Sequence, residues 1–174
     1  RKFLMWNDFL IVGPSEDPAS IRGLNPVDAI KKIAQAEGRF VSRGDRSGTH
    51  QRELAIRSKA NVMTPWSGYQ ETGQGMAATL RVADELRAYL LTDRGTFQVT
   101  RDSMSLVTLV EKNQTLVNPY HLIRVNPMAG KLVNVDGAKA MMEYATGQPV
   151  KDLIEKFGVS SFGTPLFFVS PPPS

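Results

Sequence analysis

The sequence has no cysteine among its 174 residues, which excludes disulfide bonds and thiolate metal sites while leaving the compartment open. Histidine is scarce too, with two residues, and no cluster of His, Asp and Glu has the spacing of metal ligands. No apolar run approaches the roughly 20 residues that a membrane-spanning helix needs. We therefore expect no metal site, no cofactor and no membrane span.

The excess of positive over negative charge is also small. The net charge is +4 and the pI is about 9.5. Lysines and arginines are scattered along the chain, without the basic patches and interleaved aromatic residues that are typical of nucleic-acid binding, so we expect no nucleic-acid partner. Hydrophobic residues make up 41% of the sequence, which is enough to bury the core of one domain or of two small lobes.

Predicted strands and helices alternate along the chain, which favours an α/β fold with a mainly parallel sheet flanked by helices. Asn25-Pro26 is typical of a helix start, and Ser47 is suited to cap the next helix. The expected strands span residues 9–12, 40–42, 88–91, 106–110 and 121–125. The expected helices span residues 26–37, 51–60, 76–86, 136–144 and 150–157, and residues 65–69 are expected to form a loop.

Two polar turns each join a predicted strand to a predicted helix. One runs from Ser42 to Thr49 and the other from Thr92 to Thr96. In α/β sheets such turns gather at the carboxyl ends of the strands, where helix starts, arginine forks and glycine N–H groups suit an anion. The candidate ligand-binding residues are Ser42, Arg43, Ser47, Gly48, Thr49, Thr92 and Arg94, with Asp45 and Asp93 in supporting positions.

A purely structural interpretation of the two turns stays open from the residues alone. In this interpretation Ser47 only caps a helix, while Arg43 and Arg94 form ion pairs with Asp45 and Asp93. Either turn taken alone favours the structural role, and the presence of two similar turns makes the two interpretations about equal.

An enzymatic function is not expected. A nucleophilic hydrolase would need Ser47 or Thr49 beside a base. His50 is their sequence neighbour, but adjacent residues on a helix point about 100° apart. The other histidine, His121, lies in an apolar predicted strand, and no Walker-type phosphate loop is present.

Six stretches carry a resemblance to a known family. In chain order they are Asn7–Pro14, Phe40–His50, Gly73–Met76, Leu91–Thr96, Asn118–Tyr120 and Val125–Pro127. Over nearly its whole length the sequence resembles the tungstate-binding extracytoplasmic proteins of ABC transporters. The turn from Arg43 to Thr49 also resembles that of phosphate-binding transport proteins, in which the arginine, the Ser and Thr hydroxyls and the Gly N–H hold the oxyanion.

The resemblance implies a type II periplasmic-binding-protein fold, in which two α/β lobes joined by two crossover strands close on a ligand. It implies one complete lobe at residues 13–119, which carries both turns. Residues 1–12 would form a crossover strand and the edge of the other lobe, and residues 120–174 the return crossover strand and that lobe's C-terminal helices. Family members begin with a further segment before the strand at Asn7, so we expect a fragment, or association with that segment or a second chain.

The resemblance also implies the ligand, the partner and the location. From the resemblance alone, the ligand would be tungstate, with molybdate second. A site made only of donors suits fully ionised anions, sulfate included, whereas phosphate benefits from an acceptor such as Asp; Asp45 does not decide between them, because it can pair with Arg43 instead. The partner would be an ABC transporter permease, and the location periplasmic or extracytoplasmic, at the membrane through the transporter, although the chain shows no export signal. The alternative is a phosphate- or sulfate-type oxyanion sensor or binding module that is not coupled to transport.

Overall fold

The computed structural model describes residues 1–129 and 133–172, and the chain divides into two compact units. One unit comprises residues 8–117, and the other comprises residues 1–7 together with the chain from residue 118 onward. The predicted lobe boundaries fall after residues 12 and 119. Each unit is described separately below.

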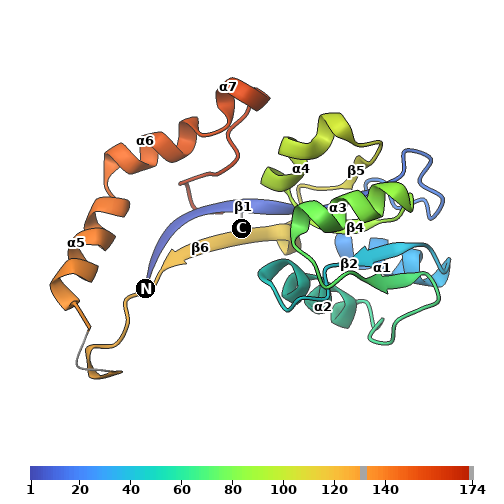
Figure 1. Ribbon diagram of the computed structural model, residues 1–174, viewed down its shortest axis with the longest axis horizontal. Helices are drawn as coiled ribbons and strands as arrows, with labels where there is room; N and C mark the ends of the chain where they lie inside the picture. Colours follow the sequence, from blue (N-terminus) through green and yellow to red (C-terminus); the bar gives the residue numbers. More distant parts are fainter. Residues whose placement is uncertain (130–132, 173–174) are drawn as a thin grey trace. The chain divides into compact units, whose positions relative to one another are not determined.

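The unit formed by residues 8–117 alternates strands and helices (Figure 1). Its strands are β1 (Lys2–Gly13, which begins in the other unit), β2 (Phe40–Ser42), β3 (Tyr69–Glu71), β4 (Leu90–Asp93) and β5 (Val107–Val110). Its helices are α1 (Pro26–Gln35), α2 (Gly48–Lys59), α3 (Met76–Glu85) and α4 (Arg94–Thr100), with 3-10 turns at Arg101–Ser103 and Gln114–Leu116. The predicted α/β class is confirmed.

The carboxyl ends of β2, β3 and β4 lie at one edge of this unit. β2 and β3 are parallel, with Ser42 opposite Glu71. β2 also runs parallel to the chain entering β4, because a bridge joins Phe40 and Tyr89, and the Val41 N–H donates to the Tyr89 carbonyl at 2.8 Å. β1 is antiparallel to both β4 and β5, so the strands form a mixed arrangement and not the mainly parallel sheet that the alternation of strands and helices predicted.

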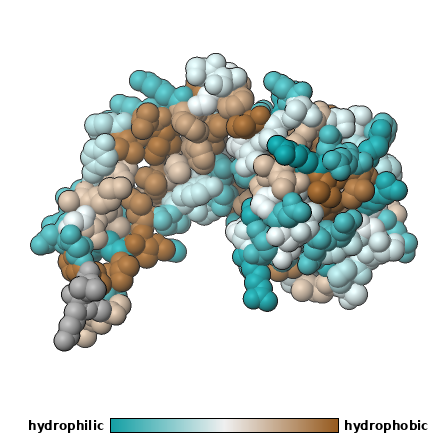
Figure 2. Space-filling view, viewed as in Figure 1, coloured by the Kyte–Doolittle hydropathy of each residue, from teal (hydrophilic) through white to brown (hydrophobic). Residues whose placement is uncertain are grey.

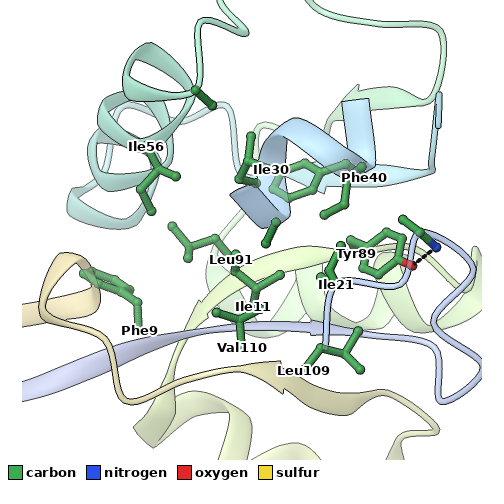
Figure 3. Close-up of a cluster of buried hydrophobic side chains, with 14 of the residues drawn as sticks. Phe9, Ile11, Ile21, Ile30, Phe40, Ile56, Tyr89, Leu91, Leu109 and Val110 are labelled. Atoms are coloured by element: carbon green, nitrogen blue, oxygen red, sulfur yellow. Dashed lines mark hydrogen bonds between the residues drawn. The ribbon is translucent and has the colours of Figure 1, made fainter. Parts of the chain in front are cut away.

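Alternate residues of β1 supply the cores on its two faces, as the two-residue period of a strand requires. Phe9 and Ile11 pack with α1 and α2, whereas Leu10 and Val12 pack with α3 and α4. Figure 3 shows the first core, in which the Tyr89 hydroxyl accepts a hydrogen bond from a backbone N–H. The first core also contains Ile30, Ile33, Phe40, Ile56, Leu91 and Leu116, and the second contains Val41, Met76, Leu80, Leu90 and Phe97.

The predicted helix caps are confirmed. The Asn25 side chain accepts hydrogen bonds from the Val27 and Asp28 N–H groups, and Ser47 accepts one from the His50 N–H. The apolar stripe of α3 is buried at Met76, Leu80 and Ala83. None of the helices in the described residues is both long and apolar enough to cross a membrane.

Pairing between strands decides several limits that the sequence patterns predicted wrongly or left out. Tyr69, the last residue of the loop expected at residues 65–69, begins β3, which forms through parallel pairing with β2. β4 spans Leu90–Asp93 instead of residues 88–91. β1 begins at Lys2 instead of residue 9, and β6 (Val117–Leu122) begins before residue 121, since these two strands pair with each other. Ile123 and Val125, placed in the predicted strand, lie beyond β6 and are exposed.

The second unit contains β6, the 3-10 turn Pro127–Ala129, and the helices α5 (Val135–Ala145), α6 (Gln148–Lys156) and α7 (Val159–Phe162). Its chain end is tied to β1, because Trp6 exchanges two backbone hydrogen bonds of 2.9 Å with Phe168, and the two rings stack. Hydrophobic surface is visible over α5 and α6 in Figure 2. Exposed apolar side chains there include Met141, Tyr144, Leu153 and Phe157.

Candidate functional site

Three polar turns lie side by side at the carboxyl ends of β2, β3 and β4. The turn after β3 is joined to the turn after β2 by backbone hydrogen bonds, from the Thr72 N–H to the Ser42 carbonyl at 3.0 Å and from the Gly73 N–H to the Arg43 carbonyl at 2.8 Å. The parallel register of Phe40 with Tyr89 brings the turn after β4 to the same edge. The structure therefore groups both predicted turns and adds a third, at residues 72–75.

Arg43 and Asp45 form an ion pair within the first turn. The Arg43 Nη2 lies 2.5 Å from the Asp45 Oδ2, while the Asp45 Oδ1 accepts the Ser47 N–H at 3.1 Å. Hydrogen bonding from Ser47, together with Arg43, lowers the pKa of Asp45 to about 2. The Arg43 Nε is buried and has no hydrogen-bond partner among the described residues, so its N–H is still able to donate.

The start of α2 adds backbone donors beside this turn. The Gly48 and Thr49 N–H groups belong to the first helical turn, which has no internal acceptors for them, and the positive end of the helix dipole lies there. A Cβ added at Gly48 would meet no atom within 4 Å, so the helix start is open at this point. Thr49 is buried, at 8% exposure. The Gly48 and Thr49 N–H groups can donate hydrogen bonds to an anion without rearrangement of the helix.

His50 is not paired with a nucleophile. Its Nδ1 accepts the Arg46 N–H at 3.0 Å, and its buried Nε2 has no hydrogen-bond partner in the described part of the chain. No Ser or Thr hydroxyl is bonded to the ring among the described residues, which is the contact that a hydrolase would use. Within those residues there is also no group of three or more His, Asp or Glu side chains that could hold a metal ion.

Ser42 lies beneath the first turn and is fully buried. Its hydroxyl donates to the Glu53 Oε2 at 2.6 Å and accepts the Gly44 N–H at 3.3 Å. Burial raises the pKa of Glu53, while hydrogen bonds from Ser42 and Tyr69 and the charge of Arg57 oppose that shift. The hydroxyl proton of Ser42 is thus directed away from the turn.

The polar side chains of the second predicted turn already have partners within the protein. The Arg94 Nε and Nη2 donate to the two Asp8 oxygens, each at 2.6 Å, and Nη2 also donates to Glu111 at 2.8 Å. These hydrogen bonds raise the pKa of Arg94, with Asp8 contributing most. Asp93 instead accepts from the Thr96 N–H at 2.8 Å and caps α4.

The structural interpretation of the turns predicted one ion pair correctly and one incorrectly. Arg43 pairs with Asp45, but Arg94 pairs with Asp8 and Glu111, because the Asp93 carboxylate is turned to the N-terminus of α4. The remaining predicted residue, Thr92, is fully buried, and its hydroxyl donates to the Asp93 carbonyl at 3.2 Å.

Sequence reasoning overlooked several polar residues at this edge. The turn at 72–75 carried a detectable signal, since two glycines before a helix repeat the composition of the first turn. Glu53 carried none, because it lies within a run of ordinary helix-forming residues and its partner Ser42 is 11 positions away. Asp8 and Glu111 reach Arg94 only through the pairing of β1 with β4 and β5.

Comparison with known proteins places the chain in a family. A model described as a PBP superfamily domain matches residues 2–148. The tungstate-binding protein TupA of Peptoclostridium acidaminophilum is 39% identical over 170 residues, which is 96% of this chain and 59% of that protein. TupA of Campylobacter jejuni is 31% identical over 97% of this chain and 64% of its own length. The chain thus spans less than two thirds of the length of these relatives.

Solved structures agree with this assignment. TupA of Desulfovibrio alaskensis G20 matches with a TM-score of 0.82 and 36% identity, covering 99% of this chain and 70% of that one. A structure described as the tungstate ABC transporter from Geobacter sulfurreducens matches with a TM-score of 0.78 and 40% identity, covering 90% of this chain and 67% of that one. The chain therefore belongs to the PBP superfamily of periplasmic binding proteins, where it is a relative of the tungstate-binding proteins of ABC transporters.

Proposed function

We propose that this chain is part of the substrate-binding component of an ABC importer, which captures a tetrahedral oxyanion outside the cytoplasm and delivers it to a permease. The observation that carries the proposal is the buried, unpartnered Nε–H of Arg43 in the turn that leads into the start of α2. An oxyanion at that point would accept from the guanidinium and from the helix start together. The names of the related proteins, a tungstate-binding protein and a tungstate ABC transporter, support a role in transport.

The direct donors in this proposal come from the first turn. Arg43 supplies its Nε–H, and the start of α2 supplies the N–H groups of Gly48 and Thr49 and the hydroxyls of Ser47 and Thr49. The other predicted residues would support the site without contacting the anion, because their polar groups already have hydrogen-bond or ion-pair partners. This supporting set is Ser42, Asp45, Thr92, Asp93 and Arg94.

Tungstate is the proposed ligand, with molybdate second. Both oxygens of Asp45 are engaged, one by Arg43 and one by Ser47, so this carboxylate is a poor acceptor for the proton of a phosphate. A site of donors alone favours anions that are fully ionised. The choice of tungstate among those anions rests on the related proteins that carry its name.

Calorimetry with tungstate, molybdate, sulfate and phosphate tests the proposal. The titrations use the 174-residue chain and a longer chain that carries the N-terminal segment expected from the family resemblance. Tungstate should bind most tightly. Binding of none of the four anions by either chain would contradict the proposal. A preference for phosphate would keep the oxyanion class and favour the alternative of a phosphate sensor or binding module.

A further inference from the structure

The hydroxyl of Ser42 has a single proton, and the structure shows where it goes. The Ser42 Oγ lies 2.6 Å from the Glu53 Oε2, and an ionised carboxylate only accepts hydrogen bonds. Ser42 is therefore the donor to Glu53. Its remaining capacity is as an acceptor, and the Gly44 N–H uses it at 3.3 Å.

Glu53 is itself held in one orientation. The Tyr69 hydroxyl lies 2.9 Å from the Oε1 of Glu53, and the Arg57 Nη1 is 3.6 Å from the same oxygen. Arg57 is fixed in turn, because it donates to the carbonyls of Val62 and Met63 and stacks 4.3 Å from the centre of the Tyr69 ring. Both Glu53 and Arg57 are 2% exposed. The carboxylate thus presents one oxygen to Ser42 and the other to Tyr69.

Gly44 is the residue through which this arrangement reaches the anion turn. Its φ of +62° is in the left-handed region, and an added Cβ would lie 2.8 Å from the Cβ of Glu71 on β3. Gly44 separates Arg43 from Asp45, which pair with each other across it. The position of the Gly44 backbone therefore sets where the Arg43 guanidinium lies.

We propose that Glu53 is a positioning residue of the anion site: it orients the Ser42 hydroxyl, which holds Gly44 and so places Arg43. This inference rests on the proposed function and assigns Ser42 a supporting role instead of direct contact with the anion. It predicts that removal of Glu53 weakens anion binding, which is opposite to the effect expected from the charge of Glu53 alone. A buried negative charge close to an anion site repels the anion, so removal of Glu53 would strengthen binding if charge were all that mattered.

Calorimetry with tungstate on two Glu53 variants separates these effects. Glu53→Leu removes both acceptor oxygens and should weaken binding at least tenfold. Glu53→Gln removes the same charge but keeps one oxygen able to accept from Ser42, so its affinity should stay within about threefold of the unmodified chain. Equal affinities in the two variants, or unweakened binding by Glu53→Leu, would overturn the proposal.

Ser42→Ala tests the same path without altering a charge. It should weaken tungstate binding as much as Glu53→Leu, and the double variant should lose no more than either single one, because both changes break one chain of contacts. If the loss of tungstate affinity in the double variant equalled the product of the two single losses, Ser42 and Glu53 would act independently, which would contradict the proposal. Ser105→Ala is the matched control, since Ser105 also donates its hydroxyl to a carboxylate, Asp84, at 2.7 Å. Its affinity should change less than twofold.

Amide hydrogen exchange in the anion-free protein gives a readout that does not depend on binding. The Gly44 N–H should exchange at least tenfold faster in Ser42→Ala and in Glu53→Leu than in the unmodified chain, whereas Ser105→Ala should leave it unchanged. If neither the 174-residue chain nor the longer chain bound any of the four anions, the proposed function would fail, and Gly44 exchange would still decide the role of Glu53. Unchanged Gly44 exchange in both variants would overturn that role.

Discussion

The Arg43 Nη2 lies 2.5 Å from the Asp45 Oδ2, while the Nε of the same guanidinium is buried and has no hydrogen-bond partner among the described residues. The Nη2 of the guanidinium is therefore paired with a carboxylate, whereas its Nε–H remains an unsatisfied donor. A buried donor without an acceptor costs about 1–3 kcal/mol. An oxyanion that accepts from this Nε–H would recover that free energy, so we expect Arg43 to be the main anion contact.

Arg43→Ala should lower the affinity for tungstate by roughly ten- to a hundredfold. A hydrogen bond to a charged group contributes about 1.5–3 kcal/mol, and 1.4 kcal/mol corresponds to about a tenfold change in affinity. Calorimetry at constant ionic strength measures the change. Arg87→Ala is the control for the loss of one positive charge, because Arg87 is exposed and pairs with Glu16 at the surface. Equal effects of the two substitutions would remove Arg43 from the site.

Gly48→Ala should weaken anion binding at least tenfold without lowering stability. The added methyl group meets no protein atom within 4 Å, and alanine is favoured over glycine in a helix by roughly 0.5–1 kcal/mol. The free energy of unfolding should thus stay equal or rise, while the methyl group blocks close approach of an anion to the start of α2. Urea denaturation and calorimetry measure the two quantities. Unchanged tungstate affinity would show that the anion does not lie over Gly48.

Local features of the site were predictable from the sequence, and long-range ones were not. Ser47 caps α2 through an N–H three residues away, and Arg43 pairs with Asp45 two residues away. Such contacts follow from residue type and spacing. Arg94, in contrast, lies 86 positions from Asp8, and the two meet only because β1 pairs with β4 in a register that places Phe9 opposite Asp93.

The strand limits show the same division. Short-range sequence patterns predict the helix caps, the buried stripe of α3 and the alternation of strands and helices, and the structure confirms all three. The start of β6 at Val117 depends on pairing with β1 and on the burial of Leu116, so the apolar run that begins at residue 121 was misleading. Pairing between distant segments carries no signal in a single sequence.

Ionised Asp45, which accepts hydrogen bonds from Ser47 and pairs with Arg43, should stabilise the fold at a pH above the ordinary pKa of a carboxylate. The pKa of Asp45 is lowered to about 2 in the folded chain, from an ordinary value of 3.8. Because the folded-state pKa is the lower one, this contribution is fully present above about pH 4 and is lost as the pH falls through about 2.

Urea denaturation between pH 5 and pH 2.5 measures this contribution by comparison with Asp45→Asn, which cannot ionise. The unmodified chain should be the more stable at pH 5, and the difference should shrink toward the acid end. A difference that grows as the pH falls would contradict the lowered pKa of Asp45.

Arg94→Met should destabilise the fold by about 2–4 kcal/mol, because it leaves Asp8 as a buried carboxylate without its cation. Asp8→Asn in the same chain should restore part of the loss, since the unpaired charge is then gone. Lys112→Ala is the control: Lys112 is an exposed partner of Glu111, and an exposed ion pair of this kind contributes about 0–1 kcal/mol. The free energy of unfolding in urea gives all three values. If Asp8→Asn deepened the loss, Asp8 would be stabilised by groups other than Arg94, and the second turn would have a different structural basis.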